Sequence, residues 1–403
     1  MSTKFGVGYT ENPKSFDAGV EMASRAMSDA VINKCDFALL YSTSKQDPIQ
    51  LGNGVRSVIG SNARLIGGYS MGIITKDYLG YEGYQAGIAV MSSDTINIDM
   101  FNTNSLPRNE FNSGIALGEK INAKAYKGDP NILIMYDAIK EQTPSAMSLN
   151  LATPLIRGIE QSIGTWPKAA GVGMMGDFQW NPTYQWFDDQ ILQNSAMALV
   201  LSGGVRMDTI IMHGCKPSSD YHKITKADGN VVLEIDGKPA VEMITNLLGE
   251  SSGIGWQDFP LFVTLGVNKG DKYGEFNEEE YANRLCMAVD KERGGLVMFE
   301  PDLEEGSEVQ LMRRSIDFQY IGQRAKKLLD GLGDRKPVFA LYIDCAGRAS
   351  AYCGTEGEEA EEVQKVIGTK MPLLGMFSGV EIAKVGNEMQ ALDWTGVLCV
   401  FSE

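Results

Sequence analysis

Three stretches of the chain share one pattern of apolar and polar positions. Each opens with an almost wholly apolar run, FALLYS, ILIMYD or VFALYID, beginning at Phe37, Ile132 and Val338. Such runs are typical of strands that are covered on both faces. An amphipathic stretch follows in each case, then a glycine-rich segment and a further apolar run. We therefore predict one folding unit that occurs three times along the chain.

A helical segment precedes each of these stretches. In the first of them, Ala18, Met22, Ala26 and Ala30 fall on one helical face, and Ser15 is placed to cap the helix. Each unit is thus expected to run helix–strand–helix–strand–strand, which gives an α/β fold with mixed sheets flanked by helices. The last two strands of each unit are joined by short, turn-rich links suited to hairpins, so a purely parallel doubly wound sheet is disfavoured.

Residues 214–260 depart from this pattern. Their sequence predicts a loop, a short hairpin around Asp228 and Gly229, and then a helix. We therefore predict two domains. Residues 1–230 hold the first two units, and residues 231–403 hold the third unit with the connecting hairpin and helix.

Composition narrows the classes of partner. The 403 residues carry 36 Lys and Arg against 52 Asp and Glu, a formal net charge of −16. This charge repels phosphate groups, and no run of Lys or Arg opposes it, so we expect neither nucleic acid nor a membrane as a partner. Two acidic stretches, residues 277–284 and 300–309, are interpreted as solvated edges. The six cysteines form no CxxC pair and no secretory signal is visible, so we expect a cytoplasmic protein with reduced thiols.

Glycine-rich bends mark the same place in each unit. The bend at residues 171–176 matches the GxGxxG dinucleotide pattern, but the DFQWNP that follows cannot open a helix, so nucleotide binding is disfavoured. The corresponding bends lie at residues 67–72 and 375–379. Such glycines either let a strand pack closely against its neighbour or leave a recess whose N–H groups bind an anion. From these bends we select Gly68, Ser70, Gly173, Gly375 and Phe377 as candidate ligand contacts.

The third unit adds the richest set of polar side chains. Asp344, Cys345 and Arg348 follow an apolar run, and Glu381 lies beside the third glycine bend. A guanidinium fork suits a carboxylate, and the Glu381 carboxylate suits an ammonium group, so these four residues join the candidate ligand site. The alternative is that Arg348 and Glu381 simply pair with each other.

Only two histidines are present, which restricts histidine-dependent chemistry. His213, Cys215 and His222 form an H-x-C-x6-H pattern of unusual spacing without an obvious fourth ligand, so no metal site is predicted. An axial haem ligand is harder to exclude, because haem needs one protein ligand and an apolar pocket. No GxSxG nucleophile elbow occurs, and no base is placed to activate Cys345 or Asp344. We therefore predict a protein that is not an enzyme, with a cysteine- or carboxylate-dependent hydrolase as a residual alternative.

The order of these motifs resembles the FIST domain family over residues 20–400. The C-terminal part, IDCAGR, GEEAEEVQ, PLLGMFSGVEI and ALDWTGVLCVFSE, is similar to the FIST C-terminal domain. ARLIGGYSMG, AAGVGMMGD and the later HGCKPSS, ITKADGN and LEIDGKPAVEMI are similar to the N-terminal part of the family. One departure concerns the family's Gly-Glu pair, which Val380 separates here into Gly379 and Glu381.

The resemblance implies sensing rather than catalysis. FIST domains are input modules of bacterial signalling proteins, and amino acids have been proposed as their ligands. We therefore expect a sensor without a cofactor that binds a small zwitterion or anion and acts on a separate output partner. Some FIST-like proteins are described as haem-binding nitric oxide sensors that regulate a histidine kinase. That is the alternative function, with His213 or His222 as the axial ligand.

Overall fold

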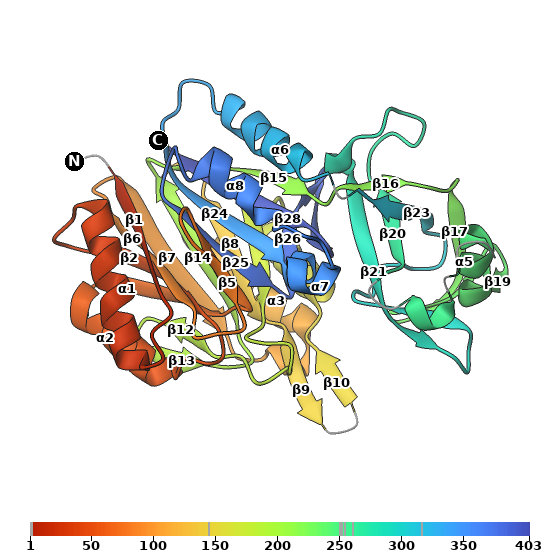
Figure 1. Cartoon of the computed structure of the whole chain (residues 1–403), viewed down its shortest axis with the longest axis horizontal. Helices are drawn as coiled ribbons and strands as arrows, with labels where there is room; N and C mark the ends of the chain where they lie inside the picture. Colours follow the sequence, from red (N-terminus) through yellow and green to blue (C-terminus); the bar gives the residue numbers. More distant parts are fainter. Residues whose placement is uncertain (1–2, 144–145, 250–252, 254, 260–261, 316) are drawn as a thin grey trace.

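The computed structural model of the chain describes residues 3–403, except residues 144–145, 250–252, 254, 260–261 and 316. It confirms an α/β fold with mixed sheets flanked by helices. Three related units form one body, and a smaller, mainly β body is inserted into the third unit and lies to one side (Figure 1). The first unit spans residues 4–92, the second 96–203, and the third 206–212 together with 319–402.

Each unit runs strand–helix–strand–helix–strand, sends out a hairpin, and closes with a last strand. The first unit comprises β1 (Lys4–Thr10), α1 (Ser15–Ala30), β2 (Phe37–Ser42), α2 (Pro48–Ile59), β3 (Arg64–Tyr69), the hairpin β4 (Gly72–Thr75) and β5 (Leu79–Tyr81), and β6 (Ala86–Ser92). The second comprises β7 (Ile96–Thr103), α3 (Glu110–Asn122), β8 (Asn131–Asp137), an additional hairpin of β9 (Ile139–Thr143) and β10 (Ala146–Leu149), α4 (Ala152–Ile163), β11 (Lys168–Met174), the hairpin β12 (Gln185–Phe187) and β13 (Gln190–Leu192), and β14 (Ala196–Gly203). The third comprises β15 (Arg206–Met212), α6 (Gln319–Asp330), β24 (Pro337–Cys345), α7 (Ser350–Cys353), α8 (Ala360–Ile367), β25 (Leu373–Ser378), the hairpin β26 (Val380–Val385) and β27 (Glu388–Leu392), and β28 (Gly396–Ser402).

Every unit builds the centre of one six-stranded sheet in the same way. In the first unit β2 pairs in parallel with β3 and antiparallel with β6, and β1 adds to β6. The strands β14–β8–β11 and β28–β24–β25 repeat this arrangement, with β7 and β15 in the place of β1. The glycine-rich strands β3, β11 and β25 would be left as sheet edges, and unpaired edges are normally covered.

The hairpins cover these edges, but each hairpin belongs to a different unit from the sheet that it completes. The hairpin β4–β5 of the first unit pairs with β25 of the third. The hairpin β26–β27 of the third unit pairs with β11 of the second, and β12–β13 of the second pairs with β3 of the first. The exchange runs once around the three units and closes on itself, so each sheet needs a hairpin from a neighbouring unit.

The three sheets face a common apolar core. Leu39 of β2, Leu133 of β8 and Leu341 of β24 lie in one buried cluster, so side chains from all three central strands meet inside the body. The helices cover the outer faces: α1 packs with α2, α3 with α4, and α6 with α8. Sheets that are buried on both faces explain why the central strands are apolar at nearly every position.

The predicted links between the last strands of each unit were wrong in one respect. Residues 64–75, which contain the first glycine bend, form two strands, β3 and β4, which belong to two different sheets instead of one hairpin. The backbone leaves the first sheet at Ser70 and Met71 and enters the third unit's sheet at Gly72. The same change of sheet separates β25 from β26, with only Gly379 between them. Hairpins are therefore present, but they extend to a neighbouring unit.

The inserted body lies between β15 and α6 of the third unit. It consists of β16 (Cys215–Pro217), β17 (His222–Asp228), β18 (Val231–Ile235), β19 (Lys238–Pro239), α5 (Ala240–Leu248), β20 (Thr264–Asn268), β21 (Tyr281–Asp290), β22 (Gly295–Met298) and β23 (Glu308–Arg314). The predicted hairpin is confirmed, since β17 and β18 pair antiparallel around Gly229, whose φ is +60°. The predicted helix after it is α5. The domain division at residues 230/231 stays a prediction.

Two glutamates contradict the interpretation of the acidic stretches as solvated edges. The Glu300 side chain is buried, and its carboxylate accepts hydrogen bonds from the backbone N–H groups of Ala152 and Thr153 at 2.9 and 2.8 Å. These N–H groups lie at the start of α4, where a helix has no backbone acceptors of its own. Glu278 forms an ion pair with Arg324 of α6 at 3.3 Å. Both glutamates thus attach the inserted body to the three-unit body.

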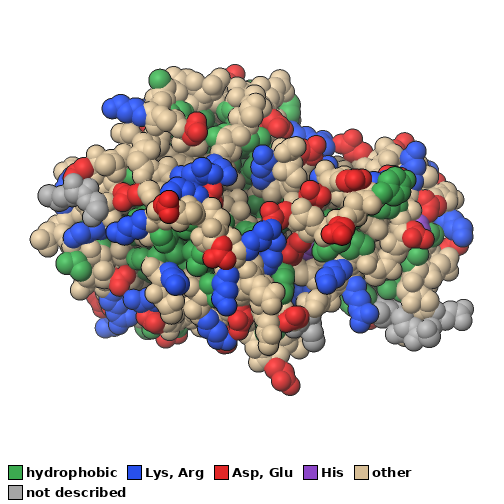
Figure 2. Space-filling model, turned by 90° about the horizontal axis from the view of Figure 1, so that it is seen from above, with side chains coloured by type: hydrophobic (Ala, Val, Ile, Leu, Met, Phe, Trp, Pro, Cys, Tyr) green, Lys and Arg blue, Asp and Glu red, His purple; other side chains and the backbone are tan. Residues whose placement is uncertain are grey.

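Two further observations concern the surface. Within the described part of the chain, no helix combines the length and the apolar character needed to cross a membrane. Across the face shown in Figure 2, acidic and basic side chains lie interspersed.

The first glycine bend gives a test of the fold. Gly67 has a φ of +147°, and a Cβ at this position would lie 1.8 Å from the carbonyl oxygen of Leu40 in the paired strand β2. We expect Gly67→Ala to lower the free energy of unfolding by about 3 kcal/mol or more, because both the backbone conformation and the space oppose a methyl group. Chemical denaturation monitored by circular dichroism measures this change.

The matched control is Gly322→Ala in α6. A Cβ there would meet only the Glu362 carboxylate end at 3.3 Å and Val366 at 3.6 Å, so alanine should be neutral or stabilising by up to about 1 kcal/mol. Equal effects of the two substitutions would contradict the close β2–β3 approach.

Candidate functional site

The three glycine bends meet one another at one end of the body. The N–H of Met71 in the first bend donates to the carbonyl oxygen of Phe377 in the third at 3.0 Å. The N–H of Gly379 donates to the oxygen of Gly173 in the second bend at 2.9 Å. The N–H of Ser44, just after β2, donates to the oxygen of Gly176 at 3.1 Å. Each unit is therefore joined to the other two through bare backbone at the bends.

This meeting point lies at the carboxyl ends of parallel strands. The pairs β2–β3, β8–β11 and β24–β25 all run in parallel, and the bends begin within the last residues of β3, β11 and β25 and continue past their ends. In open α/β sheets, ligands bind in crevices outside the carboxyl ends of strands, where connections leave in different directions. The topology of this chain brings three such ends together.

A cavity of about 290 Å³ opens over this junction, and we call it the bend recess. All three units contribute to its wall. Its lining residues are Thr43, Ser44, Lys45, Met71, Glu82, Gly176, Asp177, Phe178, Gln179 and Tyr352. The volume lies near the lower end of the range for small-molecule sites, which fits a ligand of amino-acid size.

A hydrogen-bonded carboxylate forms the polar floor of the recess. Asp177 accepts from the Ser44 hydroxyl, from the backbone N–H of Gln179 at 2.9 Å, and from the Asn181 side chain at 2.9 Å. Burial raises the pKa of Asp177, but these hydrogen bonds outweigh it and hold the pKa below its ordinary value. The recess thus presents a fixed negative charge at neutral pH.

The aromatic rings of Phe178 and Tyr352 also line the recess. Phe178 and Tyr352 meet edge-on with ring centroids 4.0 Å apart, and Tyr81 lies 5.8 Å from Tyr352. Tyr81 in turn packs edge-on against Phe377 of the third bend at 5.6 Å. The Tyr352 hydroxyl donates to the Glu82 carboxylate, and burial together with this bond raises the pKa of Tyr352. The tyrosine therefore stays protonated and can offer its ring face to a cation.

One cation completes the recess. Lys45 is exposed, and its ammonium group has no ion-pair partner among the residues that the structure describes. The wall of this small cavity thus holds one ammonium, that of Lys45, and two carboxylates, those of Asp177 and Glu82. The ammonium matches the carboxylate of a zwitterion, and a carboxylate matches its ammonium.

The predicted bend residues lie behind the recess rather than on its surface. Ser70 is fully buried, and its hydroxyl donates to the Gly72 oxygen at 3.1 Å. Hypothetical Cβ atoms on Gly68, Gly173 and Gly375 would contact Met174, Tyr136 and Tyr342 respectively, so these glycines serve close packing. Phe377 is buried beneath Tyr81. A direct ligand contact by these five residues stays a prediction.

Arg348 is buried in an ion-pair network. Its Nε donates to Asp344 at 2.9 Å, its Nη2 pairs with Glu359, and its Nη1 donates to the Trp394 oxygen at 3.0 Å. Burial alone lowers the pKa of Arg348, but Glu359 and Asp344 outweigh it and raise the pKa well above its ordinary value. Burial raises the pKa of Asp344 to about 6, although Arg348 opposes this change. The pairing with Glu381 that the sequence left open does not form.

Cys345 and Glu381 are buried near this network. Burial raises the pKa of the Cys345 thiol well above its ordinary value, which disfavours the thiolate that a nucleophile needs. Glu381 accepts from the Ser378 hydroxyl at 2.6 Å and from the Thr395 N–H at 3.3 Å. Burial raises the pKa of Glu381 well above its ordinary value, which favours the protonated form of this carboxyl group.

The two histidines differ in their surroundings. His213 is fully buried; its Nδ1 accepts from the Cys215 N–H at 3.0 Å, and its Nε2 lies 3.2 Å from the Glu278 oxygen. Both nitrogens are thus engaged, which does not fit an axial haem ligand. His222 places Nδ1 2.8 Å from Asp236, and its Nε2 has no hydrogen-bond partner among the described residues. A carboxylate on Nδ1 with Nε2 free is the arrangement of many metal-bound imidazoles.

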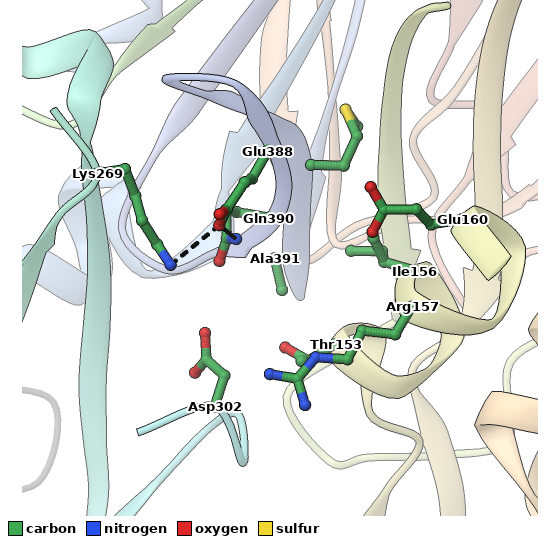
Figure 3. A pocket seen from close by; sticks show the side chains of 10 residues that line it. Thr153, Ile156, Arg157, Glu160, Lys269, Asp302, Glu388, Gln390 and Ala391 are labelled. Carbon is green, nitrogen blue, oxygen red and sulfur yellow. Dashed lines mark hydrogen bonds and ion pairs between the residues drawn. The ribbon is translucent and has the colours of Figure 1, made fainter. Parts of the chain in front are cut away.

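A second polar cavity lies where the inserted body meets the second and third units (Figure 3). Its charged groups are largely neutralised by protein partners. Lys269 pairs with Glu388 at 3.0 Å, and Arg157 pairs with Glu304 at 3.1 Å. Asp302 pairs with the buried Arg284 of β21, whose guanidinium also donates to the oxygen of Ala391 in β27 at 2.8 Å. The Lys269–Glu388 and Arg157–Glu304 ion pairs, together with the Arg284–Ala391 hydrogen bond, connect the two bodies.

Sequence reasoning missed most of the residues that line the bend recess. Ser44 follows the first apolar strand directly, and Asp177 and Phe178 follow the second glycine bend. Their positions at strand ends were the available signal, because strand ends carry functional side chains in α/β folds. Tyr352 and Glu359 gave no such signal, since only tertiary packing brings them to the recess and to Arg348.

Comparison with known proteins identifies the family. The FIST N domain model matches residues 36–238, and the FIST C domain model matches residues 240–384. Together they cover most of the chain, which therefore belongs to the FIST family. FIST domains are associated with signal transduction and small-ligand sensing.

Similar proteins occur in bacteria and archaea. The uncharacterized protein Rv0628c of Mycobacterium tuberculosis is 22% identical over 220 residues, which is 53% of this chain and 56% of that protein. The uncharacterized protein MJ1623 of Methanocaldococcus jannaschii is 25% identical over 180 residues, 43% of this chain and 34% of that protein. The matched region thus spans about half or less of these relatives.

A solved structure of cyanuric acid hydrolase from A. caulinodans shares 8% identity, with a TM-score of 0.29 over 50% of this chain and 71% of that one. This likeness is too low to support an argument about fold or function.

Proposed function

We propose that this FIST-family protein is a non-enzymatic sensor that binds a small zwitterion, such as an amino acid, in the bend recess. The observation that carries the proposal is the convergence of all three units on one cavity that holds a free ammonium and a fixed carboxylate. The Lys45 ammonium would meet the ligand's carboxylate, and Asp177 together with the Tyr352 ring would meet its ammonium.

A ligand bound in the bend recess would change the relative position of the units. Because each bend changes from one unit's sheet to another's, a ligand that contacts two bends acts on two sheets at once. A ligand that favours one relative position of the units would shift the population toward that position. A separate output partner would then read this position, as the sensory character of the family supports.

The proposal includes a cytoplasmic location. All six cysteines are free in the structure, and five of them are buried. Reduced, unpaired thiols are typical of proteins in a reducing compartment.

Haem binding through His222 is the second candidate function, and the free Nε2 with Nδ1 held by Asp236 favours it. Against it, His222 lines neither the bend recess nor the polar cavity beside Lys269, whereas haem needs an apolar slot. Titration with haemin tests it by absorption spectroscopy. The candidate function expects a Soret band that is lost in His222→Ala and retained in His213→Ala. An identical spectrum in both variants and the parent would remove it, and with it a nitric oxide sensor that regulates a histidine kinase.

The zwitterion proposal is tested by isothermal titration calorimetry with the twenty amino acids. We expect at least one to bind, and Lys45→Met to weaken its affinity by about tenfold, the loss of roughly one charge-assisted hydrogen bond. Lys326→Met is the matched control, because Lys326 is also an exposed lysine but lies on α6. Equal affinities of the two variants would contradict a contact at Lys45, and a panel without any binder would contradict the ligand class.

A further inference from the structure

The short helix α7 lies between two cavities. Tyr352 lines the bend recess, whereas the next residue, Cys353, and Thr355 line a different cavity of about 560 Å³. We call this second cavity the insertion groove, because its other wall comes from β20, β23 and the end of α5 in the inserted body. Cavities between two bodies of a protein are common places for ligands.

The insertion groove has an apolar lining with cations beside it. Phe262, Met312 and Trp394 supply apolar surface, and Phe262 is 53% exposed. The Arg314 guanidinium lies over the Trp394 ring at 4.5 Å. Arg313 also lines the groove, and it is exposed.

Arg313 has no counter-charge among the described residues, and the same holds for Lys216, a nearby cation that is not part of the groove's lining. Arg313 of β23 is the register partner of Lys216 in β16, and residues directly opposite in an antiparallel pair project on the same face. Neither has an ion-pair partner among the described residues. Like charges in this position repel each other. Arg313 therefore adds an unneutralised positive charge to the lining of the groove, in a protein whose net charge is −16.

The buried network of Arg348 connects this groove to the bend recess. Arg314 in the groove pairs with Glu359, and Glu359 also pairs with Arg348. The adjacent Glu358 accepts from the Ser350 N–H at 3.1 Å, at the start of α7, and from the Tyr81 hydroxyl at 2.8 Å. Glu359 thus contacts Arg314 of the groove, and its neighbour Glu358 contacts Tyr81, which packs against Tyr352 of the recess.

Cys353 adds a second connection, since its Sγ donates to the Arg348 oxygen at 3.2 Å. A displacement of Arg314 would therefore act on α7 through two contacts. Because Tyr352 belongs to the same short helix, the position of its ring would follow.

We propose that the insertion groove is a second ligand site, which binds a small carboxylate with an apolar body, and that its occupancy is transmitted to the bend recess through α7. The apolar body would lie against Phe262, Met312 and Trp394, and the carboxylate would lie beside Arg313. The groove site rests on its own geometry; only the regulatory meaning of the coupling rests on the proposed function of the recess.

The probe is 1-naphthaleneacetate, and the uncharged 1-naphthaleneacetamide is its matched control. We expect calorimetry to show that the acid binds and that the amide binds about tenfold more weakly, because the groove's cations recognise the charge. Arg313→Gln should weaken the acid by about the same factor without affecting the fold, since Arg313 is exposed. Lys226→Gln, which removes an exposed charge elsewhere in the same body, should leave its affinity unchanged.

Coupling is measured on the parent protein by hydrogen exchange with the probe alone. The acid should change the exchange of the amides at residues 350–355 and in the first bend, residues 70–72. Binding without any change at these amides would overturn the coupling. No binding, equal binding of acid and amide, or equal affinities of Arg313→Gln and Lys226→Gln would overturn the groove site. All of these results are independent of whether an amino acid binds in the recess.

Discussion

The structure depends on the cyclic exchange of hairpins among the three units. Each glycine-rich strand would be an open edge within its own unit, and a hairpin from a neighbour closes it. The exchange runs from the first unit to the third, from the third to the second, and from the second to the first. A unit on its own would leave the edge of its glycine-rich strand unpaired, and its hairpin would have no neighbouring sheet to join. We therefore infer that the three units fold as one cooperative body.

The same exchange creates the candidate site. A chain that moves from one sheet to the next must cross the gap between them, and the three crossings occur at one end of the body. Glycines permit these crossings. Gly67 lies too close to the Leu40 backbone, and Gly72 too close to the Phe377 ring, for either position to hold a Cβ atom. The recess is thus a consequence of the topology. The residues specific to this chain, such as Lys45, Asp177 and Tyr352, then decide what fits there.

The sequence predicted the threefold repetition and the α/β class because these rest on local patterns. The strand that starts at Phe37, for example, is buried on both faces, so its residues are apolar at nearly every position and the sequence alone shows it. It did not predict the exchange, because nothing in residues 64–75 tells which sheet the second half joins. Arg348 is a second example. The sequence shows its charge, but it does not show that Glu359 is its partner, because Glu359 lies in an acidic segment whose composition is equally typical of a solvent-exposed helix. The pattern of apolar residues along one element predicts which of its side chains are buried. Which distant elements pair with each other depends on the whole fold.

The central claim is that the junction of the three glycine bends is a ligand site. A crystal structure of the protein with the amino acid that binds it most tightly is the most direct measurement. We expect ligand density between Met71, Gly176 and Tyr352, with the ligand's carboxylate beside Lys45 and its ammonium beside Asp177. Density for the amino acid at another place, with the bend recess empty, would contradict a ligand site at this junction.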